Sequence, residues 1–307
     1  IREKFAKQGV EFLMINSNTQ DDRAALAREA EEFGIDLPIL RDETQLVGEA
    51  LGVTRTAVVF VIDPKTWKLA YRGPIDDRLS LGAQKPEAKI HYLRDAIRSV
   101  LADKPVDVAQ AEAVGCIVNL PERERKAEHA KISYTEEIAP LLQEKCVACH
   151  RPGGIGPWAM TSYENVRGFA PMIREVIRTK RMPPWFADPH VGKFIGDRSI
   201  SNEQAQMLVH WIEAGAPRGS GDDPLKNVEP LKSQWLDGEP DMVVEIPAFE
   251  VPATGVVDYK YPQVANPLGK DVWVRAIQIL PGNPAVVHHV LAGIADPSGW
   301  SIGTEEE

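Results

Sequence analysis

Cysteine is scarce in this sequence, with three residues among 307. Three cysteines are too few to build a disulfide-stabilised scaffold. Long hydrophobic runs are missing as well, because the longest, residues 57–62, has the length of a strand. A membrane-spanning helix needs about 20 apolar residues. The sequence therefore predicts no transmembrane segment.

An excess of basic residues is also missing, since 35 Lys and Arg stand against 45 Asp and Glu, for a net charge of −10. An acidic chain without a basic stripe is poorly suited to binding a phosphate backbone, which excludes nucleic-acid binding. Hydrophobic residues make up 43% and charged residues 26%, as in folded globular proteins. The length predicts two or three domains. Because the chain starts at Ile1, within a helix-like pattern, we expect a fragment of a longer polypeptide.

The first segment, residues 1–121, alternates helix-like and strand-like patterns. The periodicity predicts helices over 21–33, 42–51 and 89–101, and strands over 10–15, 37–40, 57–63 and 69–72. This order predicts an α/β layer structure with mixed strand directions.

Five motifs of this segment together resemble the thioredoxin-like peroxiredoxin family: GVEFLMINSN, LRDETQLVGEALGV, VFVIDP, LAYRGPIDDR and AVGC. The family's first βα unit, which holds the reactive cysteine, is missing, since no cysteine precedes Cys116. Ala57 follows Thr56 where the family usually has a cis-proline. We therefore expect a domain without thiol chemistry, and we expect Cys116 to be a buried or partly buried thiol.

A charged stretch, residues 122–131, has the composition of a solvated linker. The second segment, residues 132–224, follows it and ends at a GSGDDP break. Its patterns predict three helices, over 135–145, 163–178 and 201–214, the last opened by a capping box of Ser201 and Gln204. Long Pro/Gly loops join them, so this small all-α unit has little core of its own and needs something else to fill it.

The pattern C-x-x-C-H at Cys146, Cys149 and His150 is typical of covalent haem c attachment. Two thiols one helical turn apart can each bond one haem vinyl group, and the adjoining imidazole can bind the iron. A redox C-x-x-C instead needs its first cysteine at a helix N-terminus, whereas this pair follows a predicted helix. A zinc site needs a second ligand pair, which the chain lacks.

Met182 is our candidate for the sixth iron ligand, because two prolines stiffen the Met182–Trp185 loop that holds it. A thioether opposite imidazole raises the iron potential and suits electron transfer. The weaker rivals are Met160, Met172, His190 and His210. The segment resembles small cytochrome c domains with an M-P-P-W loop and a final W-I-x-x-G-A-P helix, here Trp211–Pro217. That resemblance implies attachment and axial roles for Cys146, Cys149, His150 and Met182.

The third segment, residues 235–307, has strand patterns at 242–246, 256–261, 272–280 and 286–294, which predict the start of an antiparallel β-sandwich. His288 and His289 could supply part of a type II copper site, although neighbouring side chains of a regular strand point to opposite faces. The other reading is one buried and one exposed histidine. An irregular strand start after the Pro/Gly run would let both reach one metal.

The stretch DVWVRAIQILPGNPAVVHHVLAG resembles the N-terminal domain of copper type II, ascorbate-dependent monooxygenases. The resemblance implies that the histidine pair helps to hold the electron-transferring copper, together with a third histidine later in the chain. No histidine follows His289, so we expect half a copper site.

These patterns predict an electron-transfer protein with redox partner proteins, in which a cytochrome c domain lies between a redoxin-like and a copper-oxygenase-like module. The alternatives are a copper monooxygenase supplied with electrons by its own haem, a thiol peroxidase or disulfide reductase with an added haem, and a haem-linked scaffold subunit of a larger complex. Since haem c is attached outside the bacterial cytoplasm, we expect a periplasmic or other extracytoplasmic location.

Overall fold

The computed structural model describes residues 1–80, 82–188, 191–230, 235–236, 238–265 and 267–293. Contacts divide the chain into two compact units, the first made of residues 1–132 and 172–217 and the second of residues 133–171 and 218–307. The domains expected from sequence (1–121, 132–224 and 235–307) follow a different division and stay predictions. Among the helices of the described ranges, none is long and apolar enough to cross a membrane.

The first unit begins with the expected alternation of helices and strands. Its elements are α1 Arg2–Ala6, β1 Met14–Asn16, α2 Arg23–Glu32, β2 Ile39–Arg41, α3 Leu46–Leu51, β3 Val59–Asp63, β4 Lys68–Gly73, β5 Leu79–Ser80, β6 Ala83–Gln84 and α4 Tyr92–Leu101. Strand β1 pairs in parallel with β2, and β3 pairs antiparallel with β4. Parallel and antiparallel pairs therefore both occur, but in separate two-stranded sheets, so the α/β layer structure stays a prediction. The short hairpin β5–β6 was not expected.

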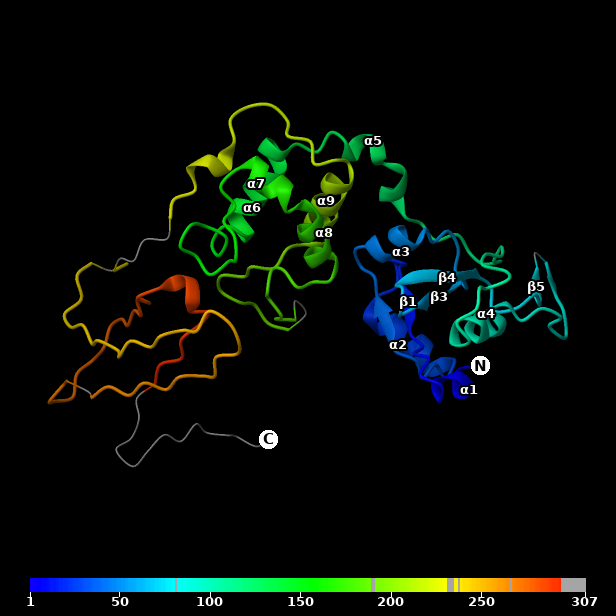
Figure 1. Ribbon diagram of the computed structural model, residues 1–307, viewed down its shortest axis with the longest axis horizontal. Coiled ribbons are helices and arrows are strands. Elements are labelled where there is room, and N and C mark those ends of the chain that lie inside the picture. Colours follow the sequence, from blue (N-terminus) through cyan, green and yellow to red (C-terminus); the bar gives the residue numbers. More distant parts are fainter. Residues whose placement is uncertain (81, 189–190, 231–234, 237, 266, 294–307) are drawn as a thin grey trace. The chain divides into compact units, whose positions relative to one another are not determined.

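Capping residues end these helices, and apolar side chains pack α4 on the β3–β4 sheet. The Asp22 side chain caps α2 by accepting a hydrogen bond from the Ala25 amide, and Gly52 ends α3 with a φ of 65°. Helix α4 lies beside β3 and β4 (Figure 1). The core between them contains the buried residues Phe5, Leu93 and Ile97, packed against Val10, Phe12, Val59 and Val61.

The stretch expected to be a solvated linker forms two short helices in the same unit, η1 Pro121–Glu124 and α5 Lys126–His129. His129 at the end of α5 is 9% exposed, so the linker prediction is wrong at this residue. Helix α5 packs against α9, Asn202–Glu213, which explains the burial. Helix α9 opens with the predicted capping box between Ser201 and Gln204.

The second unit contains helices η2 Tyr134–Ile138, α6 Ala139–Lys145, α7 Tyr163–Gly168, η3 Pro224–Asn227 and η4 Pro284–Val286. The helix expected over 135–145 starts as the π-helical turn η2, because Pro140 has no amide hydrogen with which to continue a regular α-helical ladder. The helix expected over 163–178 is interrupted at Phe169, before Pro171, and resumes as α8, Ala170–Arg178.

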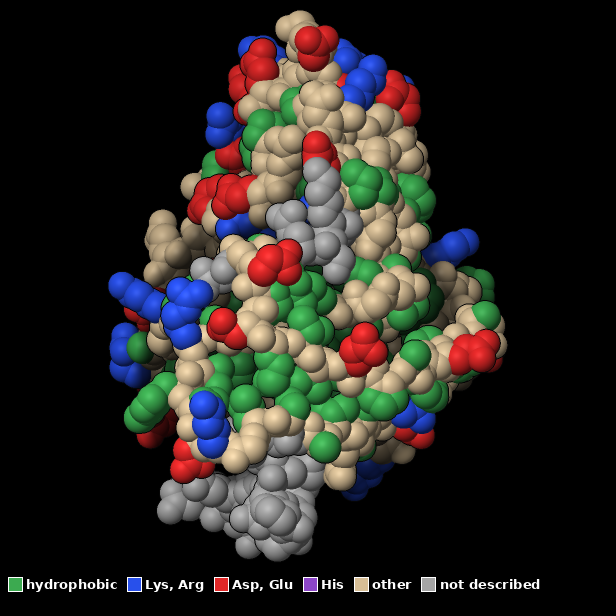
Figure 2. Space-filling view, turned by 90° about the vertical axis from the view of Figure 1, so that its left-hand side faces the viewer, with side chains coloured by type: hydrophobic (Ala, Val, Ile, Leu, Met, Phe, Trp, Pro, Cys, Tyr) green, Lys and Arg blue, Asp and Glu red, His purple; other side chains and the backbone are tan. Residues whose placement is uncertain are grey.

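The third segment runs without regular strands through the described residues from 238 to 293. Figure 1 draws it as a trace without arrows, and Figure 2 shows many hydrophobic side chains on the face it contributes. Trp273, Ile277 and Leu291 are among its exposed apolar residues. Strands need a hydrogen-bonded neighbour. In the part of the segment that the structure describes, the four expected strands have no hydrogen-bonded neighbour and are absent. The β-sandwich as a whole stays a prediction.

Candidate functional site

The C-x-x-C-H residues form a turn directly after helix α6. Cys146 is the C-cap of that helix, and its carbonyl oxygen accepts hydrogen bonds from the amides of Cys149, at 3.1 Å, and His150, at 3.0 Å. These bonds bring the two cysteines and the histidine together within one helix-like turn. The prediction that the thiol pair follows the C-terminal end of a helix is confirmed, and a helix N-terminus that would activate the first thiol is not available.

His150 is oriented by a hydrogen bond to the backbone. Its Nδ1 atom lies 3.0 Å from the carbonyl oxygen of Trp158, which makes Nδ1 the donor and leaves Nε2 as the nitrogen with a free lone pair. The Trp158 ring packs at 57° against the imidazole and stacks on Phe169, with ring centroids 4.1 Å apart. This arrangement is the usual one for a metal-binding histidine, whose second nitrogen donates to a carbonyl or a carboxylate.

Two glycines let the following loop approach this turn closely. A Cβ atom on Gly156 would lie 2.7 Å from Nδ1 and 2.8 Å from Cγ of His150. A Cβ atom on Gly154 would lie 2.4 Å from the carbonyl oxygen of Cys149. Real Cβ atoms do not approach other atoms so closely, so a larger residue at either position would displace the histidine or the backbone beside it.

The Cys146 thiol is buried, which disfavours its thiolate form. Burial, with a smaller effect from Cys149, raises the pKa of the Cys146 thiol to about 11. A thiol with that pKa is protonated near neutral pH, whereas disulfide exchange needs a thiolate. Within the described ranges, three potential metal ligands lie within 4.8 Å of one another at Glu122, His129 and His210, outside this turn.

A buried aspartate holds the two chain segments of the second unit together. Asp223, 4% exposed, accepts hydrogen bonds from the Tyr134 hydroxyl at 2.8 Å and from the Tyr163 and Leu225 amides at 2.6 and 3.0 Å. Burial, reinforced by this carboxylate, raises the pKa of Tyr134 above its usual range. Sequence reasoning missed Asp223, since it lies in the polar GSGDDP stretch that reads as a domain break.

The candidate for the sixth iron ligand, Met182, lies in the first unit, whereas the C-x-x-C-H turn lies in the second. Met182 follows α8, belongs to the first unit and is 36% exposed, so its role as an iron ligand stays a prediction. Of its rivals, Met172 is 53% exposed and Met160 is buried, with its amide bonded to the His150 carbonyl oxygen at 2.8 Å. His190 lies outside the described residues.

The structure brings His288 and His289 together. Both follow the short helix η4 on irregular backbone, as a shared metal would require, and their Nδ1 atoms lie 3.1 Å apart. The two rings meet nearly at right angles, and the Tyr259 ring lies 5.8 Å from that of His289. Two nitrogens at this separation can be neighbouring ligands of one ion, because metal–nitrogen bonds are about 2.0 Å long.

Cys116 is exposed, and the expectation of a buried or partly buried thiol is wrong. The Cys116 amide donates a hydrogen bond to the Thr56 hydroxyl, and the Cys116 carbonyl oxygen accepts one from the Thr56 amide. These bonds hold the backbone, while the thiol side chain is exposed to solvent. Ala57 in the same loop has a φ of 58°. Proline, whose ring holds φ near −65°, cannot adopt this conformation, so a proline could not replace Ala57 without a change of the loop.

Comparisons with known proteins identify no family. No known protein family matches the chain, and no curated protein matches it. Among solved structures, a hypothetical protein from Sinorhizobium meliloti 1021 is 28% identical over 38% of this chain, and an uncharacterized conserved protein from Geobacillus kaustophilus is 30% identical over 39%. Each match has a TM-score of 0.33, and the chain spans 64% of the length of each of these proteins.

Proposed function

We propose that this chain is an extracytoplasmic electron-transfer protein that carries one covalently bound haem c at Cys146, Cys149 and His150. The observation that carries the proposal is the hydrogen bond from His150 Nδ1 to the Trp158 carbonyl oxygen, 3.0 Å long. It fixes the imidazole tautomer in which Nε2 has a free lone pair for iron.

The other residues of the turn fit the same group. The Cys146 and Cys149 thiols are unpaired and only partly exposed, so each is available for a thioether bond. Gly156 leaves the His150 ring free of steric overlap. Bound haem would supply one-electron transfer. We propose Met182 as the residue that would hold the iron together with His150, and its soft sulfur would raise the potential.

The flanking segments are proposed to be a redoxin-like domain without thiol chemistry and part of a copper-oxygenase-like domain, with redox proteins as partners. A second function, a copper-dependent monooxygenase supplied by its own haem, is favoured by the 3.1 Å distance between the Nδ1 atoms of His288 and His289. A haem-linked scaffold subunit of a larger redox complex is the third candidate.

The proposal is tested by producing the full chain in a bacterial periplasm with c-type haem maturation. After denaturing electrophoresis, peroxidase staining should leave colour on the protein band, and acid–acetone should not extract it. The double exchange Cys146→Ala and Cys149→Ala should remove the colour, while Cys116→Ala, at an exposed cysteine, should leave it unchanged. Colour that survives the double exchange, or that never appears in the unchanged chain, contradicts the proposal.

A further inference from the structure

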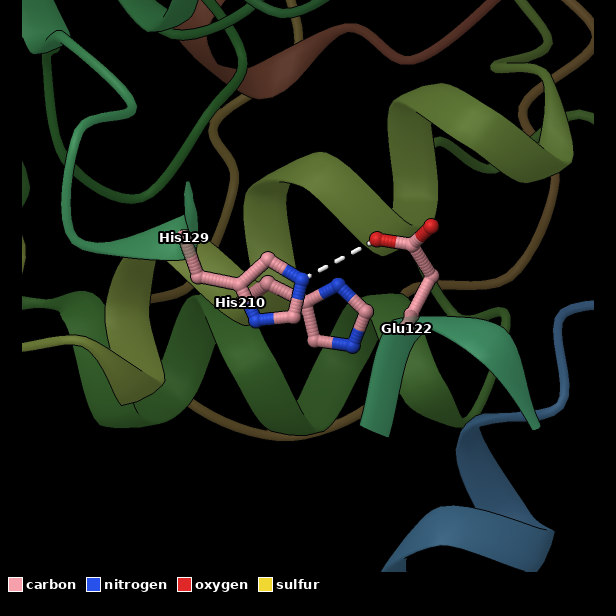
Figure 3. Close-up of side chains that lie close together, drawn as sticks. All are labelled: Glu122, His129 and His210. Carbon is pink, nitrogen blue, oxygen red and sulfur yellow. Dashed lines mark hydrogen bonds and ion pairs between the residues drawn. The ribbon is translucent and has the colours of Figure 1, made fainter. Parts of the chain in front are cut away.

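A cluster of two histidines and a glutamate lies in the first unit, away from the C-x-x-C-H turn in the sequence. Glu122 comes from η1, His129 from the end of α5 and His210 from α9 (Figure 3). His129 Nε2 lies 3.0 Å from Glu122 Oε2, and the two imidazole rings stack with centroids 4.0 Å apart. One potential ligand atom from each residue lies within 4.8 Å of the other two.

A second carboxylate orients His210 from the opposite side. Glu49 in α3 places its Oε2 atom 2.8 Å from His210 Nε2, and the two side chains are 10% and 4% exposed. This bond occupies Nε2, so Nδ1 is the His210 nitrogen left for another partner. The second oxygen of Glu49 is buried and has no hydrogen-bond partner among the described residues. A buried carboxylate that pairs with the far nitrogen of a histidine is the usual support of a metal-binding imidazole.

We propose that Glu122 Oε2, His129 Nε2 and His210 Nδ1 bind a divalent transition-metal ion of the zinc class, with Glu49 as a positioning residue for His210. Imidazole nitrogen and carboxylate oxygen are ligands that Zn²⁺ and its neighbours prefer, and two histidines with one glutamate leave a fourth position for water. Hard ions such as Mg²⁺ and Ca²⁺ prefer all-oxygen sites.

The observed distances allow such a site after small side-chain movements. Two ligand atoms on a tetrahedral zinc ion lie about 3.4 Å apart, because the bonds are about 2.1 Å long. The Glu122–His129 pair, at 3.0 Å, is close to this value, and the other pairs must approach by about 1 Å or slightly more. The rings are nearly parallel, at 8°, so the His129 ring must turn about its Cβ–Cγ bond for both lone pairs to meet one ion.

The experiment is a Co²⁺ titration of the full chain, made without haem and with Cys116, Cys146, Cys149, His288 and His289 each exchanged for alanine, so that neither the thiols nor the histidine pair compete and no haem absorption covers the cobalt bands. We expect one equivalent of Co²⁺ to bind with visible d–d absorption and without thiolate charge-transfer bands, and Zn²⁺ to displace it. Glu122→Gln should weaken binding by at least about tenfold. Glu49→Gln should weaken it by about 10- to 100-fold with the stoichiometry unchanged.

Glu124→Gln is the matched control, because Glu124 is an exposed glutamate of the same short helix. It should leave the affinity unchanged. Equal affinities for the Glu122→Gln and Glu124→Gln proteins would overturn the proposal, as would the absence of saturable binding in the reference protein. Thermal unfolding of the reference protein gives a second measurement that needs no exchange within the cluster. Its Tm should rise with added Zn²⁺, and a Tm independent of Zn²⁺ would also overturn the proposal.

Discussion

The Nδ1 atom of His150 lies 3.0 Å from the backbone carbonyl oxygen of Trp158, eight residues later in the same loop. The bond gives the imidazole one defined tautomer and one orientation, so the Nε2 lone pair is prepared before any metal binds. Gly156 approaches the same ring so closely that a side chain at this position would displace it. The orientation of His150 can therefore be tested by an exchange at Gly156, without changing a proposed ligand.

Replacing Gly156 with alanine should disturb the histidine directly. The new Cβ would lie 2.7 Å from Nδ1 of His150, so the ring or the loop must shift, at a cost of about 1–3 kcal/mol in the free energy of unfolding. Urea unfolding measures the loss, and the visible spectrum of the haem-loaded protein should change. Gly168→Ala is the control, since a Cβ there would have no atom within 4 Å apart from its chain neighbours and the backbone of its own helix. Equal stability of the two variants would contradict the steric argument.

Replacing Met182 with alanine should remove a weak absorption band near roughly 695 nm, which is expected of methionine bound to ferric haem, and should lower the potential. The physical reason is that a thioether stabilises the ferrous state more than water or a nitrogen ligand does. Met172→Ala, at an exposed methionine, serves as the control. A band that persists in the Met182 variant would show that another methionine binds the iron.

The stability of the chain should fall as the pH rises above about 10. Burial and the Asp223 carboxylate raise the pKa of Tyr134, so the folded protein keeps this proton where an unfolded tyrosine loses it. The unfolded state then binds fewer protons, and the free energy of unfolding decreases by up to about 1.4 kcal/mol per pH unit for one such group. Urea unfolding between pH 9 and pH 11, a range of about two units around the ordinary tyrosine pKa, measures this slope.

Tyr134→Phe should reduce that slope, and the remaining slope comes from Tyr71, whose pKa burial also raises. The exchange also lowers stability at neutral pH by removing the hydrogen bond to Asp223. Tyr259→Phe should leave the slope unchanged, because Tyr259 is exposed. The same slope in both variants would show that Tyr134 does not carry the alkaline effect.

Copper should bind weakly or not at all at His288 and His289. The two Nδ1 atoms are close enough to share an ion, but a type II site needs at least three well-placed ligands, and losing one costs several kcal/mol of affinity. A copper titration followed by electron paramagnetic resonance measures this, in a chain that carries Glu122→Gln to suppress the other cluster. A stoichiometric type II signal that disappears with His289→Ala would show that the site has a third ligand.

Local chemistry made the thiol and histidine turn predictable. Cys146, Cys149 and His150 lie within five residues, and a single helical turn brings them together whatever the rest of the chain does. The capping box at Ser201 and Gln204 is local in the same sense and appears where it was expected. The order of the elements from β1 to β4 also followed from periodicity, whereas the short hairpin β5–β6 did not. Breaks at Pro140 and Pro171 were readable in principle, because each proline removes a helical donor.

The contacts between residues far apart in the sequence could not be predicted, because they depend on how the elements pack. Glu49, Glu122, His129 and His210 come from four separate elements, and no spacing rule links them. From the sequence, His129 was predicted to lie in a solvated charged stretch, but it is buried because α5 packs against α9. Asp223 was predicted to lie in a domain break, but it accepts three buried hydrogen bonds. A sequence determines which side chains can bind a proton or a metal. The tertiary structure decides which of them lie within bonding distance, because burial and hydrogen bonding depend on neighbours that the local sequence does not contain.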